Sequence, residues 1–272
     1  MGHPGGRGER AAAMTTLRQA YDGAAGAWGD GPDLVFGALA AALLARGPAW
    51  EDLFVLDIGA GTGTATRRLA AAGARAVPLD AAFEMLRAAR GHCDCTPVVA
   101  DALALPLLTG SADAAVMGFL LNHLPRPAMA LREAARVVRP KGWVLASTWA
   151  RGHAHPVRQI VQQAMLDRGW RPPAWYQGLK DTTTPQSDTA EALGLLAREA
   201  GLAEVDAAQV DVPVPATARD LLEWRLGLPQ TAPFVAAMPP AELTRLWHEL
   251  QDAVADQPPL VCTVVLLVSR VP

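Results

Sequence analysis

The chain has 272 residues, of which 51% are hydrophobic, so it is long enough to bury a large core. Its formal net charge of −3, without any run of Lys or Arg, argues against a nucleic-acid-binding protein, because such proteins present a basic face to phosphates. The three cysteines, Cys93, Cys95 and Cys262, offer neither paired disulfide spacing nor a second pair of zinc ligands. We therefore expect a reducing compartment and no bound metal.

The two ends of the chain carry no targeting signal that we can identify. Residues 1–13 contain Gly, Pro and Arg without an apolar stretch, which favours a disordered lead-in over a secretory signal. The apolar run 261–268 is too short to cross a bilayer. We expect one domain over residues 14–272, located in the cytoplasm and without a membrane partner.

From residue 15 onward the pattern predicts a helix, a glycine-rich break, and a second helix that starts after Asp33 as its N-cap and ends near Gly47. Strands and helices then alternate. The expected strands are 54–58, 76–79, 96–100, 114–118 and 142–149, and the expected helices are 62–72, 81–90 and 127–138. This alternation predicts a doubly wound, Rossmann-like α/β fold with a mostly parallel sheet.

The second half of the chain is less regular. We expect a helix over 155–168, a loop over 169–187, and a helix that Asp188 caps and that ends at Ala200. A strand over 204–212, a mainly helical stretch over 216–255 and a final strand over 260–271 follow. Nothing in this half requires a second domain.

A glycine-rich turn follows the first predicted strand, in the order Asp57, Gly59, Gly61, Gly63. Glycines let the backbone approach a ligand closely, and the helix that begins there offers free N–H groups. Such a turn serves many nucleotides, and it also occurs without a ligand. Asp80 and Asp101 end the next two strands, so three carboxylates are expected at one edge of the sheet, where ligands bind.

Five stretches together resemble the class I S-adenosylmethionine (SAM)-dependent methyltransferases, in particular the "type 11" group typified by ubiquinone and menaquinone biosynthesis. They are VLDIGAGTGTATRRLA (55–70), AVPLDAAFEMLRAAR (76–90), VVADALALPL (98–107), ADAAVMGFLLNHLPRP (112–127) and LREAARVVRPKGWVLAST (131–148). The chain departs from the family at Lys141, where Gly is frequent, and we expect a local change in that turn.

The resemblance implies SAM as cofactor and S-adenosylhomocysteine as product, and it implies which residues hold the cofactor. These are Asp57, Gly59, Ala60 and Gly61 around the methionine part, Asp80, Ala81 and Phe83 at the ribose, Asp101 and Ala102 at the adenine, Gly118 and Phe119 beside the methyl group, and Tyr21 at the carboxylate. It also implies a C-terminal antiparallel strand, with helical insertions at about 151–187 and 216–255 that cover the substrate side.

His123 follows the fourth strand and is our candidate general base, although a histidine there can equally be part of the scaffold, and Asn122 shares that ambiguity. The His153–His155 pair has no identifiable third metal ligand, so we expect a substrate-side or loop role.

Further substrate-side candidates are aromatic or charged residues of the insertions: Trp149, His153, Tyr176, Trp224 and Arg225. Each aromatic residue can either line an apolar pocket or pack the insertion. Arg225 can pair with a substrate carboxylate or with Glu223 or Asp220 on its own helix.

We therefore expect a methyltransferase that acts on an O or C atom of a small, largely apolar metabolite in specialised metabolism. The alternative is a protein of the same fold that binds SAM and catalyses a non-methylating reaction such as a cyclisation. A methyltransferase of macromolecules and a dinucleotide-dependent oxidoreductase are further, less favoured hypotheses.

Overall fold

A computed structural model describes residues 16–28, 30–90 and 96–272. The predicted lead-in over 1–13 and the cysteines Cys93 and Cys95 lie outside these residues.

Seven strands form one sheet in the described residues, in the order β3-β2-β1-β4-β5-β7-β6. Their bounds are Phe54–Ile58 (β1), Arg75–Asp80 (β2), Val98–Val99 (β3), Ala112–Gly118 (β4), Val138–Trp149 (β5), Ala203–Pro213 (β6) and Val261–Arg270 (β7). The first five strands pair in parallel, whereas β7 is antiparallel to both β5 and β6. This arrangement confirms the predicted mostly parallel, Rossmann-like sheet with an antiparallel C-terminal strand.

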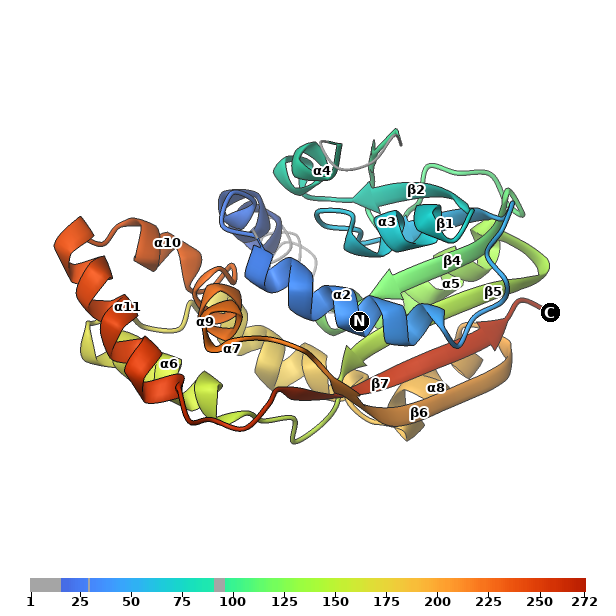
Figure 1. The fold of residues 1–272 in the computed structure, drawn as a ribbon. Coiled ribbons are helices and arrows are strands. Elements are labelled where there is room, and N and C mark those ends of the chain that lie inside the picture. Colours follow the sequence, from blue (N-terminus) through green and yellow to red (C-terminus); the bar gives the residue numbers. More distant parts are fainter. Residues whose placement is uncertain (1–15, 29, 91–95) are drawn as a thin grey trace, which may run out of the picture.

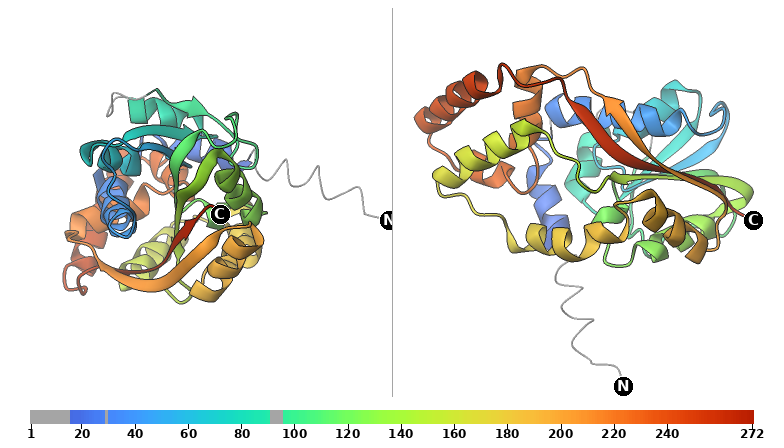
Figure 2. Two further views of the ribbon diagram at one scale, coloured as in Figure 1. Left: turned by 90° about the vertical axis from the view of Figure 1, so that its right-hand side faces the viewer. Right: turned by 90° about the horizontal axis from the view of Figure 1, so that it is seen from below.

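Helices cover both faces of the sheet and its carboxyl-terminal edge. They are α2 (Asp30–Leu44), α3 (Thr64–Ala71), α4 (Phe83–Arg90), α5 (Pro127–Val137), α6 (Pro156–Asp167), α7 (Ala174–Gly178), α8 (Ala190–Glu199), α9 (Ala218–Leu226), α10 (Ala232–Ala236) and α11 (Pro240–Val254). A further helical segment spans residues 16–24. In Figures 1 and 2, α2 and α3 lie on one face of the sheet, and α5 and α8 on the other.

Neighbouring residues of the central strands point to opposite faces, and both faces are buried. Val55 belongs to the core cluster that includes residues of α2, whereas Leu56 belongs to the cluster that includes residues of α5 and α8, and both are 0% exposed. This double burial explains why β1 is apolar at every position except Asp57 and shows no alternation of apolar and polar residues.

The helices α6, α9, α10 and α11 form a cap beyond the carboxyl ends of the parallel strands (Figure 1). The cap is joined to the rest of the domain where α9 packs on α2. A Cβ atom on Gly31 of α2 would lie 2.5 Å from the backbone nitrogen of Trp224, so glycine is required for this close approach. No helix in the described residues is long and apolar enough to span a membrane.

The structure corrects three local predictions. Asp33 lies inside α2, which begins at Asp30, and its carboxylate accepts a hydrogen bond from Arg67 at 2.5 Å. Asp188 does not cap α8, because Thr189 does so, accepting from the nitrogen of Ala192 at 3.1 Å. The segment 169–187 is not wholly loop, since α7 is followed by short helical turns through residue 186.

The turn at Lys141 keeps a left-handed backbone, with φ of 63° at that lysine. Its nitrogen donates to the carbonyl oxygen of Val271 at 2.8 Å, which ties the start of β5 to the end of β7. The lysine therefore adopts a conformation that glycine adopts at lower cost, by roughly 1 kcal/mol.

Candidate active site

A cavity of about 760 Å³ lies at the carboxyl ends of the parallel strands, between the sheet and the helical cap. This volume is in the range of sites that hold small molecules and cofactors. The cavity is lined by all of these candidates from the sequence: Tyr21, Asp57, Gly59, Ala60, Gly61, Asp80, Ala81, Asp101, Ala102, Gly118, Phe119, Asn122, His123, Trp149, His153, Tyr176, Trp224 and Arg225. Phe83, which we expected near the ribose, is 56% exposed on α4 and lies outside the lining.

The glycine-rich turn connects β1 to α3 in the conformation that its composition predicts. Gly59, Gly61 and Gly63 have φ angles of 75°, 54° and 80°. At Gly59 the close approach is as demanding as the angle, because a Cβ atom there would lie 2.9 Å from Leu120. The nitrogens of Gly59 and Ala60 both donate to the carbonyl oxygen of Leu79, so the turn is fixed against the end of β2.

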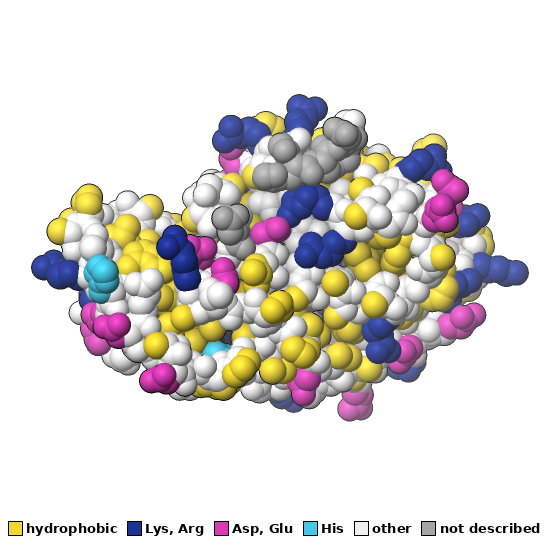
Figure 3. Space-filling view, in the orientation of Figure 1, with side chains coloured by type: hydrophobic (Ala, Val, Ile, Leu, Met, Phe, Trp, Pro, Cys, Tyr) yellow, Lys and Arg dark blue, Asp and Glu magenta, His cyan; other side chains and the backbone are white. Residues whose placement is uncertain are grey.

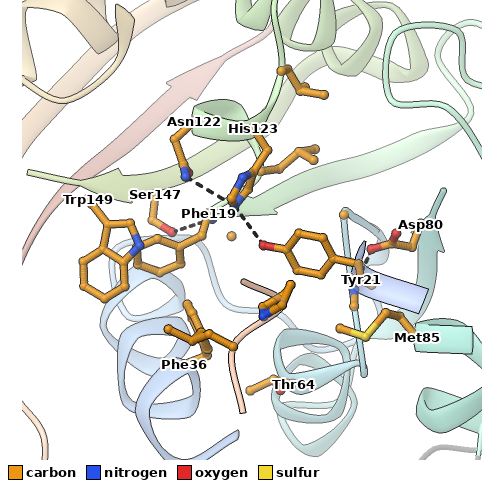
Figure 4. Close-up of a pocket in the computed structure, with 18 of the residues that line it drawn as sticks. Tyr21, Phe36, Thr64, Asp80, Met85, Phe119, Asn122, His123, Ser147 and Trp149 are labelled. Atoms are coloured by element: carbon orange, nitrogen blue, oxygen red, sulfur yellow. Dashed lines mark hydrogen bonds between the residues drawn. The ribbon is translucent and has the colours of Figure 1, made fainter. Parts of the chain in front are cut away.

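Asp80 joins the turn to the strand that precedes α4. One carboxylate oxygen accepts from the nitrogen of Gly61 at 2.8 Å, and the other accepts from Ala82 at 2.8 Å (Figure 4). Burial raises the pKa of Asp80, and these backbone hydrogen bonds counteract that rise. The carboxylate is thus held in a fixed orientation at the edge of the cavity.

The other two strand-end carboxylates differ from Asp80. Asp57 is only 1% exposed, accepts from the Thr66 hydroxyl at 2.5 Å, and has its pKa raised to about 6 by burial. Asp57 therefore ties the end of β1 to α3. Asp101 is exposed and accepts from the nitrogen of Leu103 at 2.9 Å, so it stabilises its own loop while facing the cavity.

Tyr21, Asn122 and His123 meet on the sheet side of the cavity (Figure 4). The Tyr21 hydroxyl oxygen lies 3.1 Å from His123 Nε2, and Asn122 Nδ2 lies 3.3 Å from the same nitrogen. Both neighbours can donate, which favours a neutral imidazole that carries its proton on Nδ1. Burial lowers the pKa of His123 to about 4 and raises the pKa of Tyr21, so both groups are uncharged near neutral pH.

An aromatic wall, which we define as Trp28, Phe36, Phe119, Trp149 and Trp224, lines the part of the cavity next to the cap. The ring centroids of Phe119 and Trp149 are 4.8 Å apart, and those of Trp149 and Trp224 are 6.1 Å apart. Phe119 has φ of 55°, and its nitrogen donates to the carbonyl oxygen of Ser147 at 3.0 Å. A large residue in this strained conformation is frequent at functional sites.

The two histidines after β5 take separate roles. His153 stacks on Trp149 with centroids 4.8 Å apart, and its Nδ1 accepts from the nitrogen of Thr263 at 3.2 Å. His155 is buried and caps α6 through the nitrogen of Val157. In the described part of the chain, no group of three or more His, Cys, Asp or Glu side chains could hold a metal ion.

The alternative ion pairs proposed for Arg225 are not formed. Glu223 pairs with Arg219 at 2.7 Å, and Asp220 accepts from Thr217 in the capping box of α9. Arg225 instead lines the cavity.

Several lining residues were not identified from the sequence: Trp28, Phe36, Ser147, Arg158 and Lys180. Phe36 is one of many apolar residues in α2, and its spacing alone cannot separate a cavity residue from a core residue.

The cavity therefore combines two kinds of surface: a glycine turn with a fixed carboxylate, and an aromatic wall. Residues 56–146 match the family model described as "Methyltransferase domain". The chain contains a class I SAM-dependent methyltransferase domain.

Two curated relatives of this methyltransferase domain have names that refer to menaquinone and ubiquinone. A demethylmenaquinone methyltransferase of Renibacterium salmoninarum is 34% identical over 113 residues, which cover 41% of this chain and 48% of the relative. A ubiquinone biosynthesis O-methyltransferase of Bordetella bronchiseptica is 35% identical over 100 residues, which cover 35% of this chain and 42% of the relative. The chain thus spans about half the length of these relatives or less, and the domain belongs to their group.

A solved structure with the same fold is that of the [4+2]-cyclase SpnF, with a TM-score of 0.54 and 20% identity over 87% of this chain and 80% of that one. The methyltransferase domain as matched contains the glycine turn, Asp80 and His123, whereas Tyr21 and the cap lie outside residues 56–146. The sequence matches therefore cover the glycine turn and strand-end carboxylates and leave the cap to be interpreted from its structure.

Proposed function

We propose that this protein binds SAM and transfers its methyl group to an O or C atom of a small, largely apolar molecule. The observation that carries this proposal is the joining of the glycine turn, Asp80 and the aromatic wall in one cavity. An apolar, ring-containing acceptor suits the wall, because aromatic side chains offer stacking contacts to flat molecules.

The residues present fit the cofactor. Gly61 and Asp80 together offer backbone and carboxylate groups at the strand edge, where adenosine ligands of this fold lie. Thr62 lines the cavity, and its buried hydroxyl has no hydrogen-bond partner among the described residues. A polar ligand group can satisfy this hydroxyl, because an unpaired buried polar group is costly.

When bound, SAM supplies a methyl group on a sulfonium, which is a good leaving group. The protein's contribution is then mainly to hold the acceptor in line, and positioning alone can accelerate a reaction greatly. Phe119 and Trp149, fixed by their mutual contact at 4.8 Å, restrict where a flat acceptor can lie.

For an acceptor hydroxyl, we propose that Tyr21 and His123 handle the proton. As the methyl group is transferred, the Tyr21 hydroxyl would give its proton to Nε2 of the neutral His123, 3.1 Å away, and take up the proton that leaves the acceptor hydroxyl. A C-directed reaction on an activated ring also releases a proton, from the methylated carbon, and the same pair would accept it.

The test is incubation with methyl-labelled SAM and a panel of apolar phenols and quinols. We expect labelled product and an equal amount of S-adenosylhomocysteine. The alternative, a non-methylating reaction such as a cyclisation, is motivated by the fold likeness to SpnF. Turnover of a substrate without release of S-adenosylhomocysteine would favour that alternative.

A cytoplasmic location and a place in specialised metabolism stay predictions from the sequence. The formal net charge of the chain is −3, and on the face shown in Figure 3 Lys and Arg side chains are spread out, with Asp and Glu side chains near them. The proposal therefore includes a small-molecule partner and no nucleic acid.

A further inference from the structure

Three cations line the cavity near the cap: Arg158 on the cap helix α6, Arg225 on the cap helix α9, and Lys180 in the segment that follows α7. In the part of the chain that the structure describes, none of them forms an ion pair with a carboxylate. Of the further cations that line the cavity, Arg151 pairs with Asp188 at 2.9 Å, and Arg18 lies on the helical segment 16–24. The cap thus brings positive charge to the cavity without a matching negative charge.

Arg225 is the most constrained of the three. Its Nε atom is buried without a hydrogen-bond partner among the described residues, and its guanidinium lies 5.3 Å from the centroid of the Trp224 ring. Burial lowers the pKa of Arg225 to about 10, which leaves it charged at neutral pH. The Tyr176 side chain forms a hydrogen bond with Arg225, but no carboxylate of the described residues pairs with it. A buried charge without an opposite charge beside it is unfavourable, so this arrangement favours binding of an anion.

Arg158 increases the positive potential around Arg225. The helices that carry Arg158 and Arg225 pack on each other, and both arginines line the cavity together with His153. The charge of Arg158 accordingly lowers the pKa of both Arg225 and His153. The charge of Asp211 raises the pKa of His153. Asp211 is exposed on β6, however, and it already accepts a hydrogen bond from the Thr263 hydroxyl at 2.7 Å.

The carboxylates that line the cavity are already engaged elsewhere. Asp57 and Asp80 accept hydrogen bonds from Thr66 and Gly61 at the strand ends, and Asp101 accepts from Leu103. The cavity therefore has an acidic end at the sheet and a basic end at the cap, with the aromatic wall adjoining the basic end.

We propose that the methyl acceptor carries a carboxylate, which Arg225 binds with Arg158 beside it while the acceptor's apolar body lies against Trp149 and Trp224. This inference rests on the proposed function and narrows its substrate class to aromatic or otherwise apolar acids. A guanidinium can bind a carboxylate through two parallel hydrogen bonds, which fixes orientation as well as charge. Arg225 is thus a positioning and specificity residue.

The test compares binding of 2-naphthoate and 2-naphthamide, two flat probes that differ in charge. Their dissociation constants are measured by quenching of tryptophan fluorescence and by calorimetry, with the wild-type protein and the variants Arg225→Gln and Arg158→Gln. Arg219→Gln is the matched control, because Arg219 lies on the same helix with a side chain 72% exposed. S-adenosylhomocysteine is titrated into each variant in parallel.

We expect the wild-type protein and Arg219→Gln to prefer the acid by about tenfold or more, as for a charge-assisted hydrogen bond. Arg225→Gln should lose most of that preference and Arg158→Gln part of it, with amide binding and S-adenosylhomocysteine binding unchanged. Equal binding of acid and amide by the wild-type protein would overturn the inference, even if Arg225→Gln failed to fold.

A loss of S-adenosylhomocysteine binding in Arg225→Gln with the acid preference intact would also overturn the inference, because Arg225 would then serve the cofactor. Failure of the wild-type protein to bind S-adenosylhomocysteine would instead contradict the proposed function, whatever the probes show. The two failures are therefore distinguishable.

Discussion

Asp80 gives the sharpest prediction for a single side chain. Its two oxygens accept from Gly61 and Ala82, so an amide in its place would direct an N–H group at one of these donors. We expect Asp80→Asn to weaken binding of S-adenosylhomocysteine by roughly 10- to 100-fold, the effect of losing hydrogen bonds to a charged group. Calorimetry measures this change. Asp206→Asn is the control, because the Asp206 side chain is 65% exposed and pairs with Arg46. This variant should bind S-adenosylhomocysteine as tightly as the wild-type protein does.

Tyr21 separates the two interpretations of His123. Tyr21→Phe removes the hydroxyl 3.1 Å from His123 Nε2 and keeps the ring that packs at 5.6 Å from the imidazole. If the pair accepts a substrate proton, kcat should fall by about 100-fold, the lower range for general base catalysis, while the melting temperature stays within a degree or two of the wild-type value. An unchanged kcat on a hydroxyl acceptor would assign the pair to the scaffold.

At the scale of elements, the contact between α2 and α9 holds the cap over the cavity. Gly31→Ala would place a methyl group 2.5 Å from the backbone nitrogen of Trp224. Alanine favours a helix over glycine, so α2 alone would gain stability, yet we expect the melting temperature to fall by roughly 2–10 °C because overpacking costs more. Gly23→Ala in the first helical segment has open space around the new methyl group and should leave the melting temperature unchanged or higher. Scanning calorimetry measures the melting temperature of both variants. A Gly31→Ala melting temperature equal to that of the wild-type protein would contradict the close contact between α2 and α9.

Elements were predictable where one periodicity or composition dominates. The strand 54–58 was placed at its observed bounds because both of its faces are buried and all of its residues except Asp57 are apolar. The N-cap predictions at Asp33 and Asp188 were wrong because distant partners, Arg67 and Arg151, hold these carboxylates. Local sequence cannot report such partners.

The site was predictable to the extent that topology determines it. Asp57, Asp80 and Asp101 converge because the carboxyl ends of parallel strands meet at one edge. Phe36 and Arg158 were not predicted as site residues, because their place depends on how helices outside the sheet pack around the cavity.

At the scale of the whole molecule, buried titratable groups set how stability depends on pH. His123 has a folded pKa of about 4 against an ordinary value of 6.5, so between these values the unfolded chain binds more protons and stability is lost as pH falls. Asp57 has a folded pKa of about 6 against an ordinary value of 3.8, so between these values the folded chain binds more protons. Its contribution to stability therefore increases as pH falls, opposite to that of His123.

We therefore predict that His123→Asn reduces the loss of unfolding free energy on acidification between about pH 4 and 6.5, by at most about 1.4 kcal/mol per pH unit. Asp57→Asn should make the loss of stability on acidification steeper between about pH 4 and 6. Denaturant titrations at several pH values measure both slopes. Curves parallel to that of the wild-type protein would show that these groups titrate alike in the folded and unfolded chains.

Among the described residues, the cavity has carboxylates at the sheet edge and, at the cap, Arg158 and Arg225 without an ion-pair partner. Calorimetric titration of the wild-type protein with SAM measures whether the cofactor binds, as expected if this cavity holds it at the glycine turn and Asp80. We predict one molecule bound per chain, with heat that is lost when S-adenosylhomocysteine is already present. Absence of binding at millimolar SAM would contradict it.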